Sequence, residues 1–218
     1  MYFENREDAG RRLAELLVEH KGPNTVVYAL PRGGVMVAKE IAARLASPMD
    51  LVIPRKVCHP EQSEYAVCAV AEDGHVMCDE DTEASLPKAW LSAAIERELN
   101  EAQRRREVYL EGRKPISASG KTAIIVDDGV ATGLTLLMAL FEIKHQKPAK
   151  IVAAVPVVPA DVAAKIKRDS YELIALDIPV VYKGAVGRYY REFNQVDDSQ
   201  VVEIMRMAHS YTGRKNVL

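Results

Sequence analysis

Two adjacent carboxylates, Asp127 and Asp128, end an apolar run and precede a loop of small residues in the stretch AIIVDDGVATGLTLLMAL. The small residues Gly129, Ala131, Thr132 and Gly133 leave backbone N–H groups free to surround an anion at the positive end of a following helix. Thr132 and Thr135 add hydroxyl donors. The carboxylates suit hydroxyl groups or a divalent metal with its waters. The stretch therefore predicts a site for a phosphorylated, hydroxyl-rich ligand, which is a sugar phosphate.

Cationic side chains follow two other apolar runs. Arg32 comes after TVVYAL and precedes Gly33 and Gly34, which allow backbone N–H groups to approach a ligand closely. Arg55 and Lys56 stand near the end of MDLVIPRKV. Because ligands of α/β proteins bind beyond the carboxyl ends of the strands, we expect these cations near the two acids. There they would bind further phosphate groups of the same ligand.

Each motif also has a plainer interpretation. Asp128 can be the N-cap of the following helix, PRGG an ordinary turn, and Arg55–Lys56 a solvated strand end. These alternatives explain one acid but not two, nor three ligand-type loops at one sheet edge. The loop is not a Walker P-loop, because it lacks the Gly-Lys-Ser/Thr ending, and PRGGV is too short for the GxGxxG dinucleotide motif.

Apolar runs alternate with amphipathic segments along the chain, which predicts a parallel sheet covered by helices on both faces. We expect a single α/β domain over residues 1–218, with strands at 25–30, 49–57, 121–127, 150–158 and 171–177. The expected helices cover 5–20, the segment up to 45, 83–111, the segment up to 146, 160–168 and 198–210. A hairpin is expected in YAVCAVAEDGHVMCD, where EDG indicates the turn.

The composition argues against several classes of partner. The 218 residues are 48% hydrophobic and 28% charged, and the net charge of −2 disfavours nucleic acid and acidic membrane surfaces. No apolar run approaches the roughly 20 residues of a membrane span. The start MYFENREDAGRR has no signal-peptide core, so we expect a cytoplasmic protein without nucleic-acid or membrane partners.

The cysteines and an arginine run point to structural roles. Cys58, Cys68 and Cys78 are ten residues apart, a spacing that suits neither a metal knuckle nor a redox CxxC, so we expect reduced thiols. Arg104–Arg106 fall in a predicted helix rich in acids, and we expect a solvated helix face.

The motifs resemble those of type I phosphoribosyltransferases. IIVDDGVATGLT is similar to the family's motif for phosphoribosyl pyrophosphate (PRPP): four apolar residues, two acids and a turn ending in Thr-Gly-x-Thr. ALPRGGV is similar to its pyrophosphate loop, which follows the first core strand. Phrases such as LPRGGVMVAKEIA and GAVGRYYREFNQVDD extend the resemblance to stand-alone bacterial members of the family, over nearly all 218 residues.

The resemblance implies Mg²⁺-dependent transfer of 5-phosphoribosyl from PRPP to a small nitrogenous base, with release of pyrophosphate, as in nucleotide salvage. It also implies the type I phosphoribosyltransferase fold: a mostly parallel sheet, a flexible β-hairpin loop over about 58–81 and a small hood over about 178–196. Relatives commonly form homodimers, and we expect one here. The alternative is a non-catalytic regulatory module that binds PRPP or a nucleotide, although such regulators usually carry a DNA-binding domain or a basic face.

Roles for individual residues follow from the same resemblance. Asp127 and Asp128 would hold the ribose hydroxyls, with Mg²⁺ bound indirectly through water or the ribose. The residues expected at the 5-phosphate are Gly129, Ala131, Thr132, Gly133, Leu134 and Thr135. Those expected at pyrophosphate are Arg32, Gly33 and Gly34, where relatives often have a cis peptide bond. The catalytic candidates at the base of the flexible loop are Arg55 and Lys56. The hood residues expected to stack on the acceptor base are Tyr182, Tyr189, Tyr190 and Phe193.

Two departures from the family pattern concern the substrate. Hypoxanthine- and guanine-type enzymes carry an acid at the place of Ala131, where it approaches the base, so a 6-oxopurine acceptor is disfavoured. Leu134 and the segment CHPEQSE also differ from the family's commoner small residues and glycine-rich loop. The sequence therefore leaves the acceptor base open.

Overall fold

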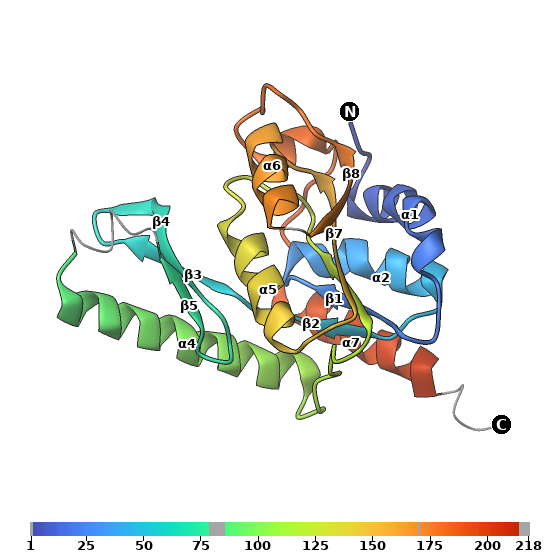
Figure 1. The fold of residues 1–218 in the computed structure, drawn as a ribbon, viewed down its shortest axis with the longest axis horizontal. Coiled ribbons are helices and arrows are strands. Elements are labelled where there is room, and N and C mark those ends of the chain that lie inside the picture. Colours follow the sequence, from blue (N-terminus) through green and yellow to red (C-terminus); the bar gives the residue numbers. More distant parts are fainter. Residues whose placement is uncertain (1, 79–85, 170, 214–218) are drawn as a thin grey trace.

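Five parallel strands form the central sheet of the computed structural model, which describes residues 2–78, 86–169 and 171–213. They lie in the order β2–β1–β6–β7–β8, and every neighbouring pair is parallel (Figure 1). The strands are β1 (Thr25–Ala29), β2 (Met49–Leu51), β6 (Thr122–Val126), β7 (Lys150–Val157) and β8 (Glu172–Asp177). The predicted α/β fold with a parallel sheet is confirmed.

Helices cover both faces of this sheet, because its central strands bury apolar side chains on both sides (Figure 1). On one face the core includes α1 (Arg6–Leu16), α2 (Gly33–Leu45) and α7 (Asp198–Gly213). On the other face it includes α5 (Leu134–His145) and α6 (Ala160–Arg168). Two 3₁₀ helices are η1 (Val18–His20) and η2 (Val186–Tyr189). Within the described ranges, no helix has the length and apolar character needed to cross a bilayer.

The strand order places a switch point between β1 and β6. The chain leaves β1 for α2 on one face and leaves β6 for α5 on the other face. Loops that diverge in this way open a crevice at the carboxyl edge of the sheet, where α/β proteins bind ligands. The two loops at this crevice are residues 30–32 and 127–133, which contain the predicted motifs.

A second, antiparallel sheet follows β2 in the chain. Its strands β3 (Arg55–His59), β4 (Gln62–Val70) and β5 (Val76–Cys78) pack against α4 (Lys88–Leu110), in the left part of Figure 1. The single strand predicted over 49–57 is wrong: residues 52–54 separate β2 from β3, and Pro54 lacks the N–H that a strand interior needs. The predicted hairpin is confirmed as β4 and β5. Of the loop predicted as flexible, residues 58–78 form this hairpin region, and 79–81 lie outside the described residues.

The prediction of reduced thiols is wrong for two cysteines. Cys68 and Cys78 form a disulfide, whereas Cys58 is free. The two bonded residues are direct partners in the β4–β5 ladder, with their Cα atoms 4.0 Å apart. The register of the hairpin therefore decides the pairing, which a spacing of ten residues does not indicate.

The arginine run of α4 is only partly a solvated face. Arg104 and Arg105 form ion pairs with Glu101 one turn earlier, as expected. Arg106 instead forms ion pairs with Asp50 and Glu72 in the interior, and its side chain is 17% exposed. The periodicity of the helix turns this third arginine inward.

Candidate functional site

A cavity of about 160 Å³ lies at the carboxyl edge of β6. Its lining residues come from the turn after β6, the start of α5, β3 and η2. They are Lys56, Asp127, Gly129, Val130, Ala131, Thr132, Gly133, Thr135, Leu136 and Val186. The fold thus brings one predicted acid, one predicted cation and most of the predicted phosphate-binding turn around a single cavity.

Two glycines shape this turn. Gly133 has a φ of 83° and immediately precedes α5, whose first turn is capped by none of the described side chains. A Cβ at Gly133 would lie 2.5 Å from Cγ1 of Val162, and one at Gly129 would lie 2.4 Å from Cγ1 of Val186. The alternative of Asp128 as N-cap is wrong, because Gly133 occupies that position. The uncapped N–H groups and the helix dipole favour a phosphate beside this turn.

The carboxylates of Asp127 and Asp128 have different surroundings. Asp127 lines the cavity, and its Oδ1 accepts a hydrogen bond from the backbone N–H of Asp128 at 2.8 Å. Oδ2 of Asp128 accepts a hydrogen bond from Nε of Arg6 at 2.6 Å. Burial and the charge of Asp128 raise the pKa of Asp127 well above its usual range. Burial also raises the pKa of Asp128, against the opposing charge of Arg6. A hydroxyl donor or a metal would therefore stabilise the ionised form of Asp127 more than that of Asp128.

Arg6, which belongs to none of the sequence motifs, holds Asp128 in place. Its side chain is 10% exposed, and its Nη1 donates a hydrogen bond to the backbone oxygen of Asn194 at 2.7 Å. Its guanidinium carbon lies 3.8 Å from the ring centre of Phe193. One signal was available in the sequence: Arg6 precedes Ala9 and Leu13 by three and seven residues, and so shares the buried face of α1.

Gly33 and Gly34 let the start of α2 contact the two acids. A Cβ at Gly33 would lie 1.9 Å from Oδ2 of Asp128. A Cβ at Gly34 would lie 2.8 Å from the backbone oxygen of Val126. Both distances are shorter than the 3.0 Å that real Cβ atoms keep. The packing of α2 against the end of β6 therefore requires both glycines, in addition to any contact with a ligand.

Arg32 lies just before α2, and the peptide bond that joins it to Pro31 is cis, as the family resemblance implies. Its Nη1 lies 3.4 Å from Oδ1 of Asp198, which also accepts a hydrogen bond from Oη of Tyr109 at 2.7 Å. This carboxylate on α7 draws the guanidinium away from the cavity lining. The predicted contact of Arg32 with pyrophosphate requires the side chain to exchange Asp198 for the ligand.

Arg55 and Lys56 point in opposite directions, because successive side chains of a strand alternate. Lys56 lines the cavity. Nε and Nη2 of Arg55 donate hydrogen bonds to Oε2 of Glu98 on α4, at 3.1 and 2.9 Å. The pair begins β3 and does not end a strand of the central sheet, which corrects the prediction. Lys56 is placed to meet a ligand, whereas Arg55 attaches the antiparallel sheet to α4.

Comparison with known proteins agrees with this arrangement of turn, acids and glycines. The family model described as "Phosphoribosyl transferase domain" matches residues 2–193. The chain belongs to this family. The match includes both loops at the switch point and extends to the last of the predicted hood aromatics.

Two curated proteins of Mycobacterium tuberculosis are similar to this phosphoribosyl transferase domain. Those of strains CDC 1551 and H37Rv, each named "Putative phosphoribosyl transferase", are 40% identical to it over 209 residues. The alignments cover 95% of this chain and 47% of each relative, so the chain spans about half the length of the curated relatives it matches. The crystal structure of TT1426 from Thermus thermophilus has a TM-score of 0.79 and 36% identity, covering 94% of this chain and 98% of that chain.

Two aromatic residues of the predicted hood have packing roles in this phosphoribosyl transferase domain. Tyr189 and Tyr190 are 1% and 3% exposed, so their rings are packed inside the protein, and their stacking on an acceptor base stays a prediction. Tyr190 packs against Phe3, and its Oη donates a hydrogen bond to the backbone oxygen of Asp128 at 2.5 Å. An isolated β-bridge pairs Tyr190 with Phe3, so this part of the predicted hood packs beside the first described residues.

The other hood residues lie closer to solvent. Phe193 is 37% exposed, and the guanidinium of Arg6 lies over its ring in a cation–π contact. Tyr182 stacks on Tyr189, and its buried Oη has no hydrogen-bond partner among the described residues. Val186, which was not predicted, is the hood residue that lines the cavity. Leu134 packs with Ala69, Ala71 and Met138, so its side chain joins α5 to the hairpin and does not line the cavity.

Proposed function

We propose that this protein transfers a 5-phosphoribosyl group from PRPP to a nitrogenous base and releases pyrophosphate. The observation that carries the proposal is the cavity of about 160 Å³, which Asp127, Lys56 and the turn at the start of α5 line together. A carboxylate suits the hydroxyls of a ribose, and an uncapped helix start suits its phosphate. Membership of the phosphoribosyl transferase domain family supports the same ligand.

The chain's own groups would act by orientation and by charge. The turn of residues 129–135 would hold the 5-phosphate with backbone N–H groups and the hydroxyls of Thr132 and Thr135. Asp127 would accept hydrogen bonds from the ribose hydroxyls and fix the sugar. Lys56 would stabilise negative charge that develops on the leaving pyrophosphate. Holding donor and acceptor in one geometry lowers the entropic barrier to their reaction, so the transfer needs no covalent nucleophile.

Mg²⁺ fits the donor set at this site. Asp127 and Asp128 offer hard carboxylate oxygens, which Mg²⁺ prefers, and burial, together with the charge of Asp128, raises the pKa of Asp127, so a nearby cation would stabilise its ionised form. Asp128 is already paired with Arg6, so Asp127 would hold the ion, through water or the ribose. When bound, Mg²⁺ supplies neutralisation of charge on the pyrophosphate group.

Calorimetric titration with PRPP and MgCl₂ tests the binding half of the proposal. The Asp127→Asn, Asp128→Asn double variant should lose PRPP affinity by at least 100-fold and keep a cooperative unfolding transition. Asp169→Asn, an exposed acid at the end of α6, is the matched control and should bind like the wild type. Unchanged affinity in the double variant would refute the proposed site.

A pyrophosphate-release assay with PRPP and a panel of purine, pyrimidine and non-nucleobase acceptors tests the catalytic half. Turnover with any of these bases supports the transferase. PRPP binding without turnover across the panel would instead support a regulatory module that senses PRPP. Because Ala131 provides no carboxylate near an acceptor base, hypoxanthine and guanine should be poorer acceptors than adenine.

A further inference from the structure

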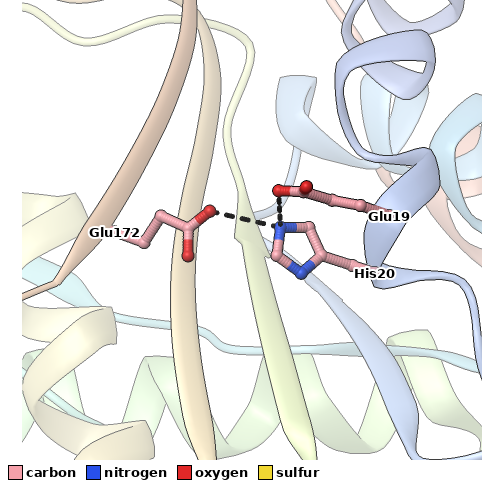
Figure 2. A group of neighbouring side chains, drawn as sticks. All are labelled: Glu19, His20 and Glu172. Carbon is pink, nitrogen blue, oxygen red and sulfur yellow. Dashed lines mark ion pairs between the residues drawn. The ribbon is translucent and has the colours of Figure 1, made fainter.

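Three metal-ligand side chains gather at the amino edge of the sheet, opposite the acids of the proposed site. Glu19 and His20 belong to η1, and Glu172 is the first residue of β8 (Figure 2). One ligand atom from each residue lies within 4.8 Å of the others. The five residues of β6 rise about 3.3 Å each, so the two edges are about 17 Å apart. This cluster therefore lies outside the site for PRPP.

The imidazole of His20 is buried and incompletely satisfied. Its side chain is 5% exposed, and Nε2 has no hydrogen-bond partner among the described residues. Figure 2 shows the carboxylates of Glu19 and Glu172 directed at this same nitrogen, at 3.5 and 3.3 Å. A charge-assisted hydrogen bond would bring an oxygen to about 2.8 Å. The three groups converge on Nε2 at 3.3–3.5 Å, longer than a charge-assisted hydrogen bond, and neither carboxylate satisfies this nitrogen.

A central ion accounts for that spacing. Zn²⁺ binds nitrogen and carboxylate oxygen at about 2.0–2.1 Å in tetrahedral geometry, which places neighbouring ligand atoms about 3.3 Å apart. The observed separations from Nε2 are 3.3 and 3.5 Å. We propose that Glu19, His20 and Glu172 form a binding site for a zinc-like divalent cation. One imidazole and two carboxylates suit Zn²⁺ better than Mg²⁺ or Ca²⁺, which prefer oxygen ligands alone.

The groups around the cluster support this role. Nζ of Lys150 lies 2.6 Å from Oε2 of Glu172 and orients that carboxylate with Oε1 toward His20. The hydroxyl of Thr25 donates a hydrogen bond to the backbone oxygen of His20 at 2.6 Å and fixes η1 on β1. The side chain of Glu19 is 71% exposed, which gives an ion and a fourth, water ligand access from solvent. A bound ion would join η1 to the edge strand β8.

Titration of the full chain with ZnCl₂ alone, followed by calorimetry, tests the site. We expect one saturable site per chain with a Kd on the order of 1 µM, and at least tenfold weaker binding in His20→Gln and in Glu172→Gln. His59→Gln, in the distant antiparallel sheet, should bind like the wild type. Five millimolar MgCl₂ should not displace the zinc. Equal affinity in wild type and Glu172→Gln, or loss of binding in His59→Gln, would overturn the proposal.

Two further measurements locate the ion independently of affinity. Zinc should shift the imidazole nitrogen resonances of His20 and should raise the melting temperature by about 5 °C at 100 times Kd. Should His20→Gln fail to fold, the exposed Glu19→Gln carries the same test. A melting temperature that zinc leaves unchanged, with His20 resonances that do not respond, would overturn the proposal.

Discussion

At each edge of the central sheet a nitrogen-bearing side chain faces carboxylates, Arg6 at one edge and His20 at the other, and the two differ in chemistry. At the carboxyl edge, Asp128 pairs with Arg6, whose guanidinium stays protonated and has no lone pair to give. At the amino edge, Glu19 and Glu172 face His20, whose imidazole nitrogen can offer a lone pair to a metal. A guanidinium fixes one acid and leaves the next acid to a ligand, whereas an imidazole with a lone pair lets the whole cluster bind a cation.

Removing the permanent cation should have the largest effect on stability. Arg6→Met should lower the free energy of unfolding by about 4 kcal/mol at pH 7, because Asp128 stays buried without its partner. Without Arg6 the pKa of Asp128 in the folded state rises further, so the loss should shrink as the pH falls and the acid takes up a proton. Urea unfolding at pH 7 and pH 5 measures both effects.

Arg12→Met is the matched control for that variant. It breaks a half-exposed ion pair with Asp8 on the same helix and should cost about 1 kcal/mol or less. Adding Asp128→Asn to Arg6→Met should recover part of the lost stability. Equal losses of unfolding free energy in Arg6→Met and Arg12→Met would show that burial gives the Arg6–Asp128 pair no special contribution to stability.

A buried acid on α5, Glu142, sharpens the comparison. Oε2 of Glu142 on α5 is buried with no hydrogen-bond partner among the described residues. Burial, helped by the charges of Glu72 and Asp73, raises the pKa of Glu142 to about 8 from its ordinary value of 4.5. The folded protein therefore keeps a proton that the unfolded chain releases between these values, and stability falls as the pH rises through that window.

Unfolding in urea at pH 5.5 and pH 8.5 measures this dependence. The wild type should lose about 3 kcal/mol between the two values, and Glu142→Gln should lose much less, because its amide does not titrate. Glu107→Gln, an exposed acid on α4, is the control and should behave like the wild type. The same pH dependence in Glu142→Gln would contradict the assignment.

The close approach of α2 to the acids predicts a smaller loss. Gly33→Ala places a Cβ 1.9 Å from Oδ2 of Asp128 and should cost about 2 kcal/mol and at least tenfold in PRPP affinity. Gly22→Ala is the matched control, since a Cβ there meets no atom within 4 Å, and its effect should stay within about 0.5 kcal/mol. Thermal unfolding and PRPP titration of both variants check the difference.

The amino edge should give the smallest effect in the absence of metal. His20→Gln should change stability by about 1 kcal/mol, because the imidazole Nε2 makes no short hydrogen bond to lose. PRPP affinity should stay within twofold of the wild type, since the edges are about 17 Å apart. A tenfold loss of PRPP affinity would mean that the two edges are coupled.

Contiguous motifs were the part of the site that the sequence predicted best. The turn from Asp127 to Thr135 lies around one cavity because its residues are neighbours in the chain and their small side chains constrain the local backbone. The parallel sheet was equally predictable, since alternating apolar and amphipathic segments have few other ways to bury their faces. Strand limits failed at residues 49–57, where a change of sheet interrupts the apolar run.

Partners that are distant in the chain were not predictable in this way. The contact of Arg6 with Asp128 joins residues that are 122 positions apart. The choice of Lys56 over Arg55 at the cavity depends on which side of β3 faces α4. The disulfide between Cys68 and Cys78 depends on the hairpin register. Each of these facts is a property of how elements pack and not of any local pattern.

The sequence by itself determined most of the elements, the small-residue turn and the pair of acids, because secondary structure and loop chemistry depend on neighbours within a few residues. The tertiary structure decided which acid has a cation, which of Arg55 and Lys56 reaches the cavity, which tyrosines are buried and which carboxylates surround His20. Burial and long-range pairing set the charge of each group and decide whether a ligand can reach it. Burial and pairing both arise when the helices pack on the sheet.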